Sequence, residues 1–201
     1  MQDSDRFERA IQNFDAANSK DPNVEVAEGN PWPRELLYAA RLSEWVSRLA
    51  PEASEHLRLA ARAQHLCRWE IPRNSYPMDK AGYLRWRNEL KKFHARRAGE
   101  ILAECGYAEP ESEKVQNLIL KKNFPADPES RVIEDGLCLV FLQYQLADLA
   151  AKTDDAKMIN ALQKSWRKMT ERARQAALEL KYPPRELALI QQALSDPAVL
   201  L

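Results

Sequence analysis

The sequence predicts an all-α protein, folded as a single helical bundle. Only five of the 201 residues are glycine, and runs of β-branched residues that would favour strands are few. Alanine, leucine, arginine, glutamate and lysine dominate the composition, and all five have high helix propensity. A chain of this length can bury a substantial core without disulfides or a structural metal. We therefore expect one domain, residues 1–201, with eight to nine helices.

The first helix begins at a capping residue, Asp3 or Ser4, and runs to about Asn18. Its apolar residues recur at spacings of three and four: Phe7, Ala10, Ile11 and Phe14. The segment 19–33 combines Asp-Pro, Gly-Asn and two later prolines without a helical period, so we expect a loop there. Pro33 suits the first turn of a second helix that reaches about Leu49.

The second and third helices carry basic residues beside their apolar faces. The inner face of the second holds Leu37 or Tyr38, Arg41, Leu42, Trp45 and Leu49. Pro51 interrupts the chain, and a third helix follows from about Ala53 to Arg68. Its face of Leu57, Ala60, Ala61 and Gln64 continues through His65 and Arg68.

The fourth helix gives the sharpest local pattern. Asp79 caps it, Gly106 ends it after about Cys105, and a loop with two prolines precedes it. Residues at spacings of three and four along it are Tyr83, Arg87, Leu90, His94, Ala98 and Ile101. We therefore expect Arg87 and His94 on its apolar face.

The remaining helices are expected at about 110–122, 129–151, 154–169, 170–180 and 185–194. The helix at 129–151 contains the most apolar run of the chain, GLCLVFLQYQL, and should be the most buried. Glu134 and Asp135 precede that run, and we expect one of them to face inward. The last three helices have the pattern of packing elements.

Charge is balanced over the whole chain, with 30 basic and 30 acidic residues, but residues 60–98 hold ten basic against three acidic side chains. A positive field confined to one region favours an anionic small molecule over a long polyanion. No segment has the roughly 18 consecutive apolar residues of a membrane span, and the polar N-terminus does not resemble a signal peptide. We expect a cytoplasmic protein without membrane contact.

Three cysteines, Cys67, Cys105 and Cys138, are odd in number and form no CxxC pair. This pattern predicts ordinary reduced thiols, without a disulfide framework or a zinc–thiolate site.

The basic segment suggests an anion-binding pocket. Arginine guanidinium groups bind phosphate and carboxylate oxygens in a bidentate manner, and aromatic rings stack on ligand rings. The candidate cations are Arg68, Arg73, Arg87 and Lys91, and the candidate stacking residues are Trp69, Tyr76 and Trp86. Arg41 is a further candidate ligand-binding residue, although an arginine at the edge of an apolar face also commonly extends its head to water.

The string QHLCRWEIPRNSYPMDKAGYLRWRNELKKFHA, with ELLYAARLSEWV before it and EDGLCLVFLQYQL after it, resembles the family called domain of unknown function 4202. The chain is identified as a member of that family on these segments, which cover most of its length. The family name implies no activity.

The order of elements also resembles, more weakly, the HD-domain superfamily of metal-dependent phosphohydrolases. In this resemblance His65 matches the histidine of the His-Asp pair and Leu66 replaces its aspartate. Tyr38 stands where the first histidine ligand would be, His94 matches an additional histidine of a later helix, and Asp135 matches the final aspartate.

The resemblance to that superfamily implies a divalent metal, Fe, Mn or Zn, on His65, His94 and Asp135, with Glu70 or Glu134 as a fourth donor. It would make the protein a degenerate phosphohydrolase or a relative of oxygenases, although two of the four standard ligands are missing. In the alternative interpretation, the two histidines are satisfied core residues and Asp135 pairs with an arginine: Arg41, Arg68 or Arg87. A third hypothesis is a non-catalytic module for a protein or RNA, which would use Lys91, Lys92, Arg96 and Arg97. Nucleic acid is the less favoured partner.

Overall fold

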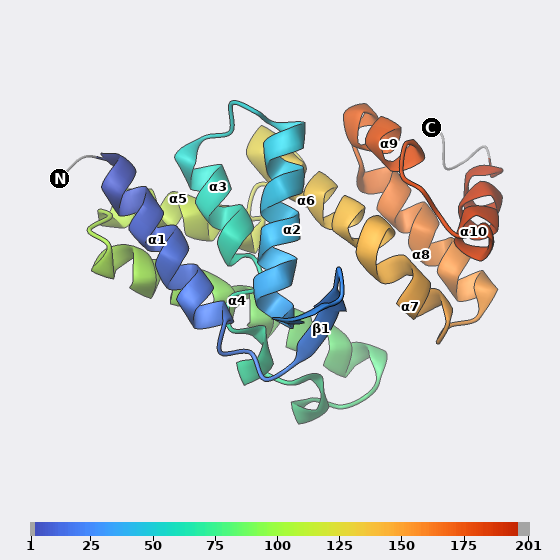
Figure 1. The fold of residues 1–201 in the computed structure, drawn as a ribbon, viewed down its shortest axis with the longest axis horizontal. Coiled ribbons are helices and arrows are strands. Elements are labelled where there is room, and N and C mark those ends of the chain that lie inside the picture. The colour runs from blue at the N-terminus through green and yellow to red at the C-terminus, as the bar shows by residue number, and fades with distance from the viewer. Residues whose placement is uncertain (1–2, 197–201) are drawn as a thin grey trace. The chain divides into compact units, whose positions relative to one another are not determined.

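The computed structural model describes residues 3–196, and nearly all of its regular structure is helical (Figure 1). Its α-helices are α1 (Asp3–Asn18), α2 (Arg34–Leu49), α3 (Glu55–Ala63), α4 (Lys80–Glu104), α5 (Glu109–Leu120), α6 (Pro128–Val140), α7 (Leu146–Ala150), α8 (Asp155–Lys168), α9 (Glu171–Leu178) and α10 (Pro184–Leu194). The predicted all-α class is confirmed. Within the described range, no helix has the length and apolar character needed to cross a bilayer.

The number of helices exceeds the prediction because one expected helix is divided. A single π-helical turn, Phe141–Gln145, lies between α6 and α7. The chain forms two compact units, residues 1–130 and residues 131–201. The assignment of the whole chain to a single domain stays a prediction.

The expected loop at 19–33 contains a β-hairpin, so that prediction was wrong in part. Strand β1 (Val24–Ala27) pairs antiparallel with β2 (Asn30–Pro33) through a two-residue turn in which Glu28 and Gly29 have φ of 51° and 78°. Positive φ at both positions is typical of the turn that suits strand twist. The two prolines are tolerated because β2 has one neighbour only, and alternate N–H groups of such a strand point away from it.

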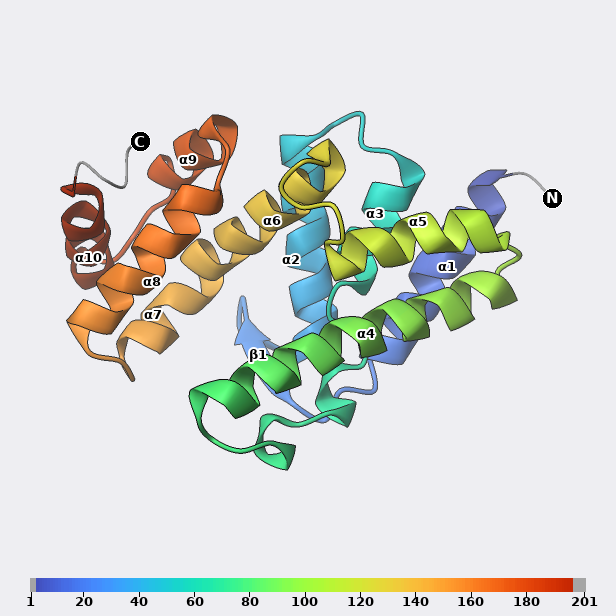
Figure 2. The same cartoon turned by 180° about the vertical axis from the view of Figure 1, so that it is seen from behind.

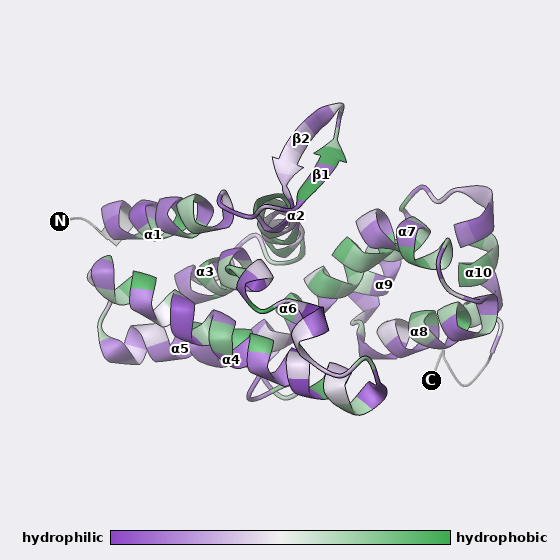
Figure 3. Ribbon diagram, turned by 90° about the horizontal axis from the view of Figure 1, so that it is seen from below, coloured by the Kyte–Doolittle hydropathy of each residue, from purple (hydrophilic) through white to green (hydrophobic). Residues whose placement is uncertain are grey.

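The hairpin leaves one apolar strand at the surface. Figure 3 shows β1 in the hydrophobic colour, and Val24 and Val26 are 55% and 70% exposed. On the other face of β1, Glu25 forms an ion pair with Arg41 of α2. This ion pair attaches the hairpin to the helix that follows it.

Helix α3 ends five residues earlier than predicted. Ser54 caps its start by accepting a hydrogen bond from Leu57 N, and the helix stops at Ala63. Cys67 then adopts a left-handed conformation with φ of 54°, followed by a short 3-10 turn, η1 (Arg68–Glu70). The backbone N–H of Cys67 donates to the Asn18 side chain of α1 at 3.0 Å, and this tertiary bond accompanies the reversal of the chain. His65 therefore lies on the turn after α3 and Arg68 lies on η1, so neither belongs to an α-helix.

A second short turn, η2 (Arg73–Ser75), leads to α4, which Asp79 caps as predicted by accepting from Gly82 N at 2.6 Å. Helix α4 lies beside α5 (Figure 2). Its buried face passes through Gly82, Trp86, Leu90, His94 and Ala98. This row at a spacing of four places Trp86 inward, so the prediction of a buried Arg87 was wrong. Both Arg87 and Tyr83 are exposed.

In the second unit, the apolar run is buried as predicted, with Leu139, Val140, Leu142 and Leu146 each at most 5% exposed. Glu134 and Asp135, which precede this run, are both buried, whereas we expected only one of them to face inward. Lys168 Nζ lies 3.0 Å from Glu134. The Asp135 carboxylate accepts from Thr170 N and Oγ1, at 2.9 and 2.6 Å, next to the start of α9.

We predict that Gly82→Ala destabilises the protein more than Gly99→Ala, although both changes add the same methyl group to α4. A Cβ at Gly82 would lie 2.1 Å from the backbone oxygen of Pro77, whereas a Cβ at Gly99 would meet the flexible end of Gln116. Overpacking against backbone costs about 1–3 kcal/mol, and alanine otherwise gains up to about 1 kcal/mol in a helix. Urea unfolding of both variants measures the difference. Equal stabilities would contradict the close approach at Pro77.

Candidate functional site

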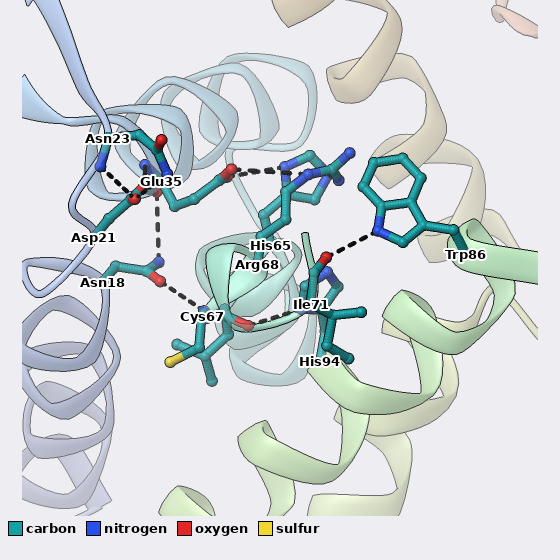
Figure 4. A network of polar contacts seen from close by, with 11 residues as sticks. Asn18, Asp21, Asn23, Glu35, His65, Cys67, Arg68, Ile71, Trp86 and His94 are labelled. Carbon is teal, nitrogen blue, oxygen red and sulfur yellow. Dashed lines mark hydrogen bonds and ion pairs between the residues drawn. The ribbon is translucent and has the colours of Figure 1, made fainter. Parts of the chain in front are cut away.

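The first turn of α2 faces the turn that follows α3, and three side chains meet there (Figure 4). His65 Nδ1 lies 3.2 Å from Glu35 Oε2. Arg68 Nη1 lies 3.2 Å from His65 Nε2, and Arg68 Nε lies 3.8 Å from Glu35 Oε1. The glutamate is buried, whereas the side chains of His65 and Arg68 are 21% and 29% exposed. The cluster therefore joins a buried carboxyl group to a partly exposed imidazole and guanidinium.

A buried polar network holds the backbone on both sides of this cluster (Figure 4). Asp21 accepts a hydrogen bond from Glu35 N at 3.0 Å and from Asn23 N at 2.9 Å. Asn18 donates to Glu35 O at 3.4 Å and accepts from Cys67 N at 3.0 Å. Since Asn18 contacts both α2 and the Cys67 turn, it fixes the position of Glu35 relative to His65 and Arg68.

His65 is held as a neutral imidazole with a defined tautomer. A guanidinium has only hydrogens to donate, so Arg68 makes His65 Nε2 the acceptor and we assign the ring proton to Nδ1, which faces Glu35. Burial, followed by the positive charges of Arg68, Lys121 and Arg87, holds the pKa of His65 well below its usual value. The Tyr38 ring stacks on the imidazole, with centroids 4.0 Å apart.

His94 of α4 lies next to the same ring, with the centroids of His65 and His94 5.8 Å apart. Its Nδ1 is 2.7 Å from the carbonyl oxygen of Leu66, which can only accept, so Nδ1 carries the proton. Its Nε2 is buried and has no hydrogen-bond partner in the described residues. Burial and the neighbouring His65 lower the pKa of His94 to about 3, so this histidine is also neutral.

Glu35 is the titratable group of the site that changes charge near neutral pH. Burial raises its pKa to about 7, against the opposing effect of Arg68. Its Oε2 lies within ion-pair distance of His65 Nδ1 but is not aligned for a hydrogen bond. Catalytic hydrogen bonds are often long or poorly aligned without ligand. The site thus holds a carboxyl group that exchanges a proton in the neutral range.

Arginines and aromatic rings alternate on the exposed side of the cluster. The Arg68 guanidinium lies 4.8 Å from the centroid of the Trp86 ring, whose Nε1 donates to Ile71 O at 2.9 Å. The Arg73 guanidinium lies 5.9 Å from the ring centroids of both Trp86 and Tyr83. Arg87 lies 5.7 Å from the Tyr83 ring. We call these five side chains, Arg68, Trp86, Arg73, Tyr83 and Arg87, the arginine–aromatic strip.

The structure thus brings together some of the predicted ligand-binding residues. Arg68, Arg73 and Arg87 belong to the strip, and Trp86 is its central ring. Arg41 forms an ion pair with Glu25 of the hairpin, and its part in ligand binding stays a prediction. Trp69, Tyr76 and Lys91 are half-buried, and their part in ligand binding stays a prediction.

The donors do not fit the metal site that the superfamily resemblance implies. In the part of the chain that the structure describes, no three His, Cys, Asp or Glu side chains are arranged to hold a metal ion. His65 Nε2 faces a guanidinium, and both carboxylate oxygens of Asp135 accept from Thr170. Leu66 is fully buried as an apolar residue.

Cys67, Cys105 and Cys138 are all buried, and the prediction of ordinary thiols stays a prediction. Burial raises the pKa of Cys67 to about 11, so its thiol stays protonated. A hollow of about 500 Å³ lies away from the histidines, lined mainly by Trp32, Leu36, Leu37 and Ala40. The charged pair at its edge, Arg62 and Asp15, is mutually satisfied at 2.6 Å.

Sequence reasoning missed Glu35 and the two residues that hold it, Asn18 and Asp21. A signal for Glu35 was present, because it precedes Tyr38 by three positions and Leu42 by seven, on the buried face of α2. Asn18 and Asp21 lie at a helix end and in a loop, where such residues usually cap or turn the chain locally. Their long-range bonds carry no local signal.

A family model described as Domain of unknown function (DUF4202) matches residues 8–190. The match covers most of the 201 residues and agrees with the family that the sequence motifs indicated. No curated protein and no solved structure matches the chain. The resemblance to the HD-domain superfamily stays an expectation.

We predict that Glu35→Gln changes how stability depends on pH. With a pKa of about 7 in the folded state against an ordinary 4.5, Glu35 keeps a proton that the unfolded chain has released between these values. Its contribution to stability is therefore present below pH 4.5 and is lost as pH rises to about 7. Glutamine does not titrate, so the free energy of unfolding of the variant should rise relative to that of the wild type by about 3 kcal/mol between pH 4.5 and 8. Urea unfolding at several pH values measures this, and a constant difference would contradict it.

Proposed function

The chain belongs to the family described as Domain of unknown function (DUF4202), and because that description names no activity, we propose from the site itself that the protein binds a phosphorylated or otherwise anionic small molecule at Arg68. The observation that carries this proposal is the incomplete compensation of the Arg68 charge. Its only carboxyl neighbour in the described residues, Glu35, lies 3.8 Å away, and burial raises the pKa of this carboxyl group to about 7. The adjacent His65 and His94 are neutral.

The rest of the arginine–aromatic strip supports the same proposal. Arg73 donates to three backbone oxygens, those of Tyr76, Pro77 and Asp79, and forms no ion pair with a carboxylate in the described residues. Arg87 is exposed and contacts the Tyr83 ring. Guanidinium groups backed by aromatic rings are suited to oxyanions, because the ring leaves the donor edge of the guanidinium accessible.

A small ligand suits the site better than a polyanion. Farther along α4, Lys92 pairs with Glu89, and both Arg96 and Arg97 pair with Glu100. These pairs give that surface mixed charge and leave the uncompensated positive charge near Arg68. The proposed ligand is therefore the size of a phosphate ester.

We expect sulfate to bind the wild type and Arg68→Ala to weaken that binding by about tenfold or more, since a hydrogen bond to a charged group contributes about 1.5–3 kcal/mol. Arg96→Ala is the matched control, because Arg96 is an exposed arginine of α4 outside the strip. Titration calorimetry and amide chemical shifts, with chloride at equal ionic strength as a blank, measure the affinities. Equal losses in the two variants would rule out the site.

We also expect sulfate to bind more tightly at pH 6 than at pH 8. Sulfate keeps two negative charges over this range, whereas Glu35, with a pKa of about 7, becomes negative and competes for Arg68. Burial lowers the pKa of both His65 and His94, which favours the neutral form of each ring. The affinity of Glu35→Gln should be independent of pH. A pH dependence that persists in this variant would assign the effect to another group.

A further inference from the structure

The imidazole of His65 lies between a carboxyl group and the proposed anion site. Its Nδ1 faces Glu35 Oε2 at 3.2 Å and its Nε2 faces Arg68 Nη1 at 3.2 Å. A carboxylate behind Nδ1 orients an imidazole and stabilises the imidazolium that forms when Nε2 takes a proton. The arrangement is therefore that of a general base whose accepting nitrogen points toward the ligand.

The two histidines of the cluster differ in the feature that this chemistry needs. The side chain of His65 is 21% exposed, so a ligand can approach it. His94 is 2% exposed, its Nε2 is buried, and its Nδ1 is bonded to the Leu66 carbonyl. Only the first of these two rings combines a carboxyl partner with access from outside.

We propose that His65 and Glu35 form a proton-transfer dyad that acts on the ligand bound at Arg68. The inference rests on the proposed anion-binding function. In the step, His65 Nε2 forms an N–H bond with the proton of an O–H group held beside the anion, either a hydroxyl of the ligand or a water molecule. The O–H electron pair stays on that oxygen, and the Nδ1 proton stays between His65 and Glu35. The product is an imidazolium next to the Glu35 carboxylate and a deprotonated oxygen beside the anion, to which the imidazolium can return the proton.

Arg68 links ligand binding to this step. In the structure the Nη1 group of Arg68 donates a hydrogen bond to Nε2 of His65, so this nitrogen is not available to a ligand. A guanidinium binds an anion more strongly than a neutral acceptor, because Coulomb attraction adds to the hydrogen bond. An anion at Arg68 therefore draws the guanidinium away from the imidazole and makes Nε2 available when the ligand is present.

The groups that face His65 from the neighbouring elements favour its neutral form. Arg68, Arg87 and Lys121 oppose its protonation, and Glu35 lies against its Nδ1. His94 adds a neutral ring and Tyr38 an aromatic face. Proton transfer to Nε2 thus requires the Glu35 carboxylate, which makes Glu35 a positioning residue and His65 the residue that meets the ligand.

Diethyl pyrocarbonate tests the dyad without a known substrate, because it acylates neutral imidazole nitrogens that are accessible. Mass spectrometry gives the rates for His65, for half-buried His56 as an internal reference, and for buried His94 as a blank. We expect Arg68→Ala to raise the ratio of the His65 rate to the His56 rate several-fold, because Nε2 is uncovered. Glu35→Gln should lower the same ratio several-fold. An unchanged ratio in Glu35→Gln would overturn the dyad.

Nitrogen-15 spectra of the wild-type histidines provide a second measurement that needs no variant. We expect His65 as the neutral Nδ1–H tautomer at pH 6, with Nε2 unprotonated, whereas the Nε2–H tautomer would overturn the inference. Failure of the underlying function has a different signature. It appears as loss of the sulfate difference between Arg68→Ala and Arg96→Ala, while the tautomer and acylation results stand.

Discussion

The geometry of the site depends on one buried side chain, Asn18, which holds a left-handed turn in place. Cys67 has φ of 54°, a conformation that costs a non-glycine residue about 1–2 kcal/mol. Asn18 is fully buried and accepts from the N–H of Cys67, while its amide nitrogen donates to the carbonyl oxygen of Glu35. One amide group thus joins the end of α1, the first turn of α2 and the turn after α3. Without this bond, nothing local to the sequence after Ala63 would place His65 and Arg68 opposite Glu35.

Burial then decides which groups keep their charge. Desolvation lowers the pKa of both histidines and raises that of Glu35 to about 7. The guanidinium groups stay protonated, because arginine is charged at any physiological pH. The permanent charges of the site are therefore positive, and the group that titrates is the carboxyl beside them. Anion binding and proton exchange follow from the same desolvation, which is why the two proposals concern one cluster.

The sequence predicted what depends on local pattern. The helical class, the Asp79 cap, the end of α4 at Gly106 and the buried apolar run of α6 and α7 follow from composition, capping and periodicity. Predictions failed where a tertiary contact or the choice between spacings of three and four decided the outcome. Trp86, and not Arg87, lies on the buried side of α4, because the buried row continues four residues back from Leu90 and not three. Likewise, the Asn18 bond to Cys67 has no signature in residues 53–68, so the early end of α3 and the turn position of His65 could not be predicted.

The expected resemblance to metal-dependent hydrolases and the observed contacts concern the same positions around His65. Where the sequence lacks a metal ligand, the structure shows a contact that suits a neutral imidazole next to a guanidinium. Tyr38, which the expected resemblance aligns with the first histidine ligand, stacks on the His65 ring. Leu66, which it aligns with the aspartate, is buried, and its carbonyl oxygen accepts from His94. A cation next to His65 would be repelled by Arg68, whose guanidinium occupies the accepting nitrogen. A guanidinium attracts an anion as a metal would, but it has no coordination position at which to ionise water. Proton transfer to or from a ligand held by Arg68 would therefore need a side chain, and His65 backed by Glu35 is the pair in the cluster that we propose for it.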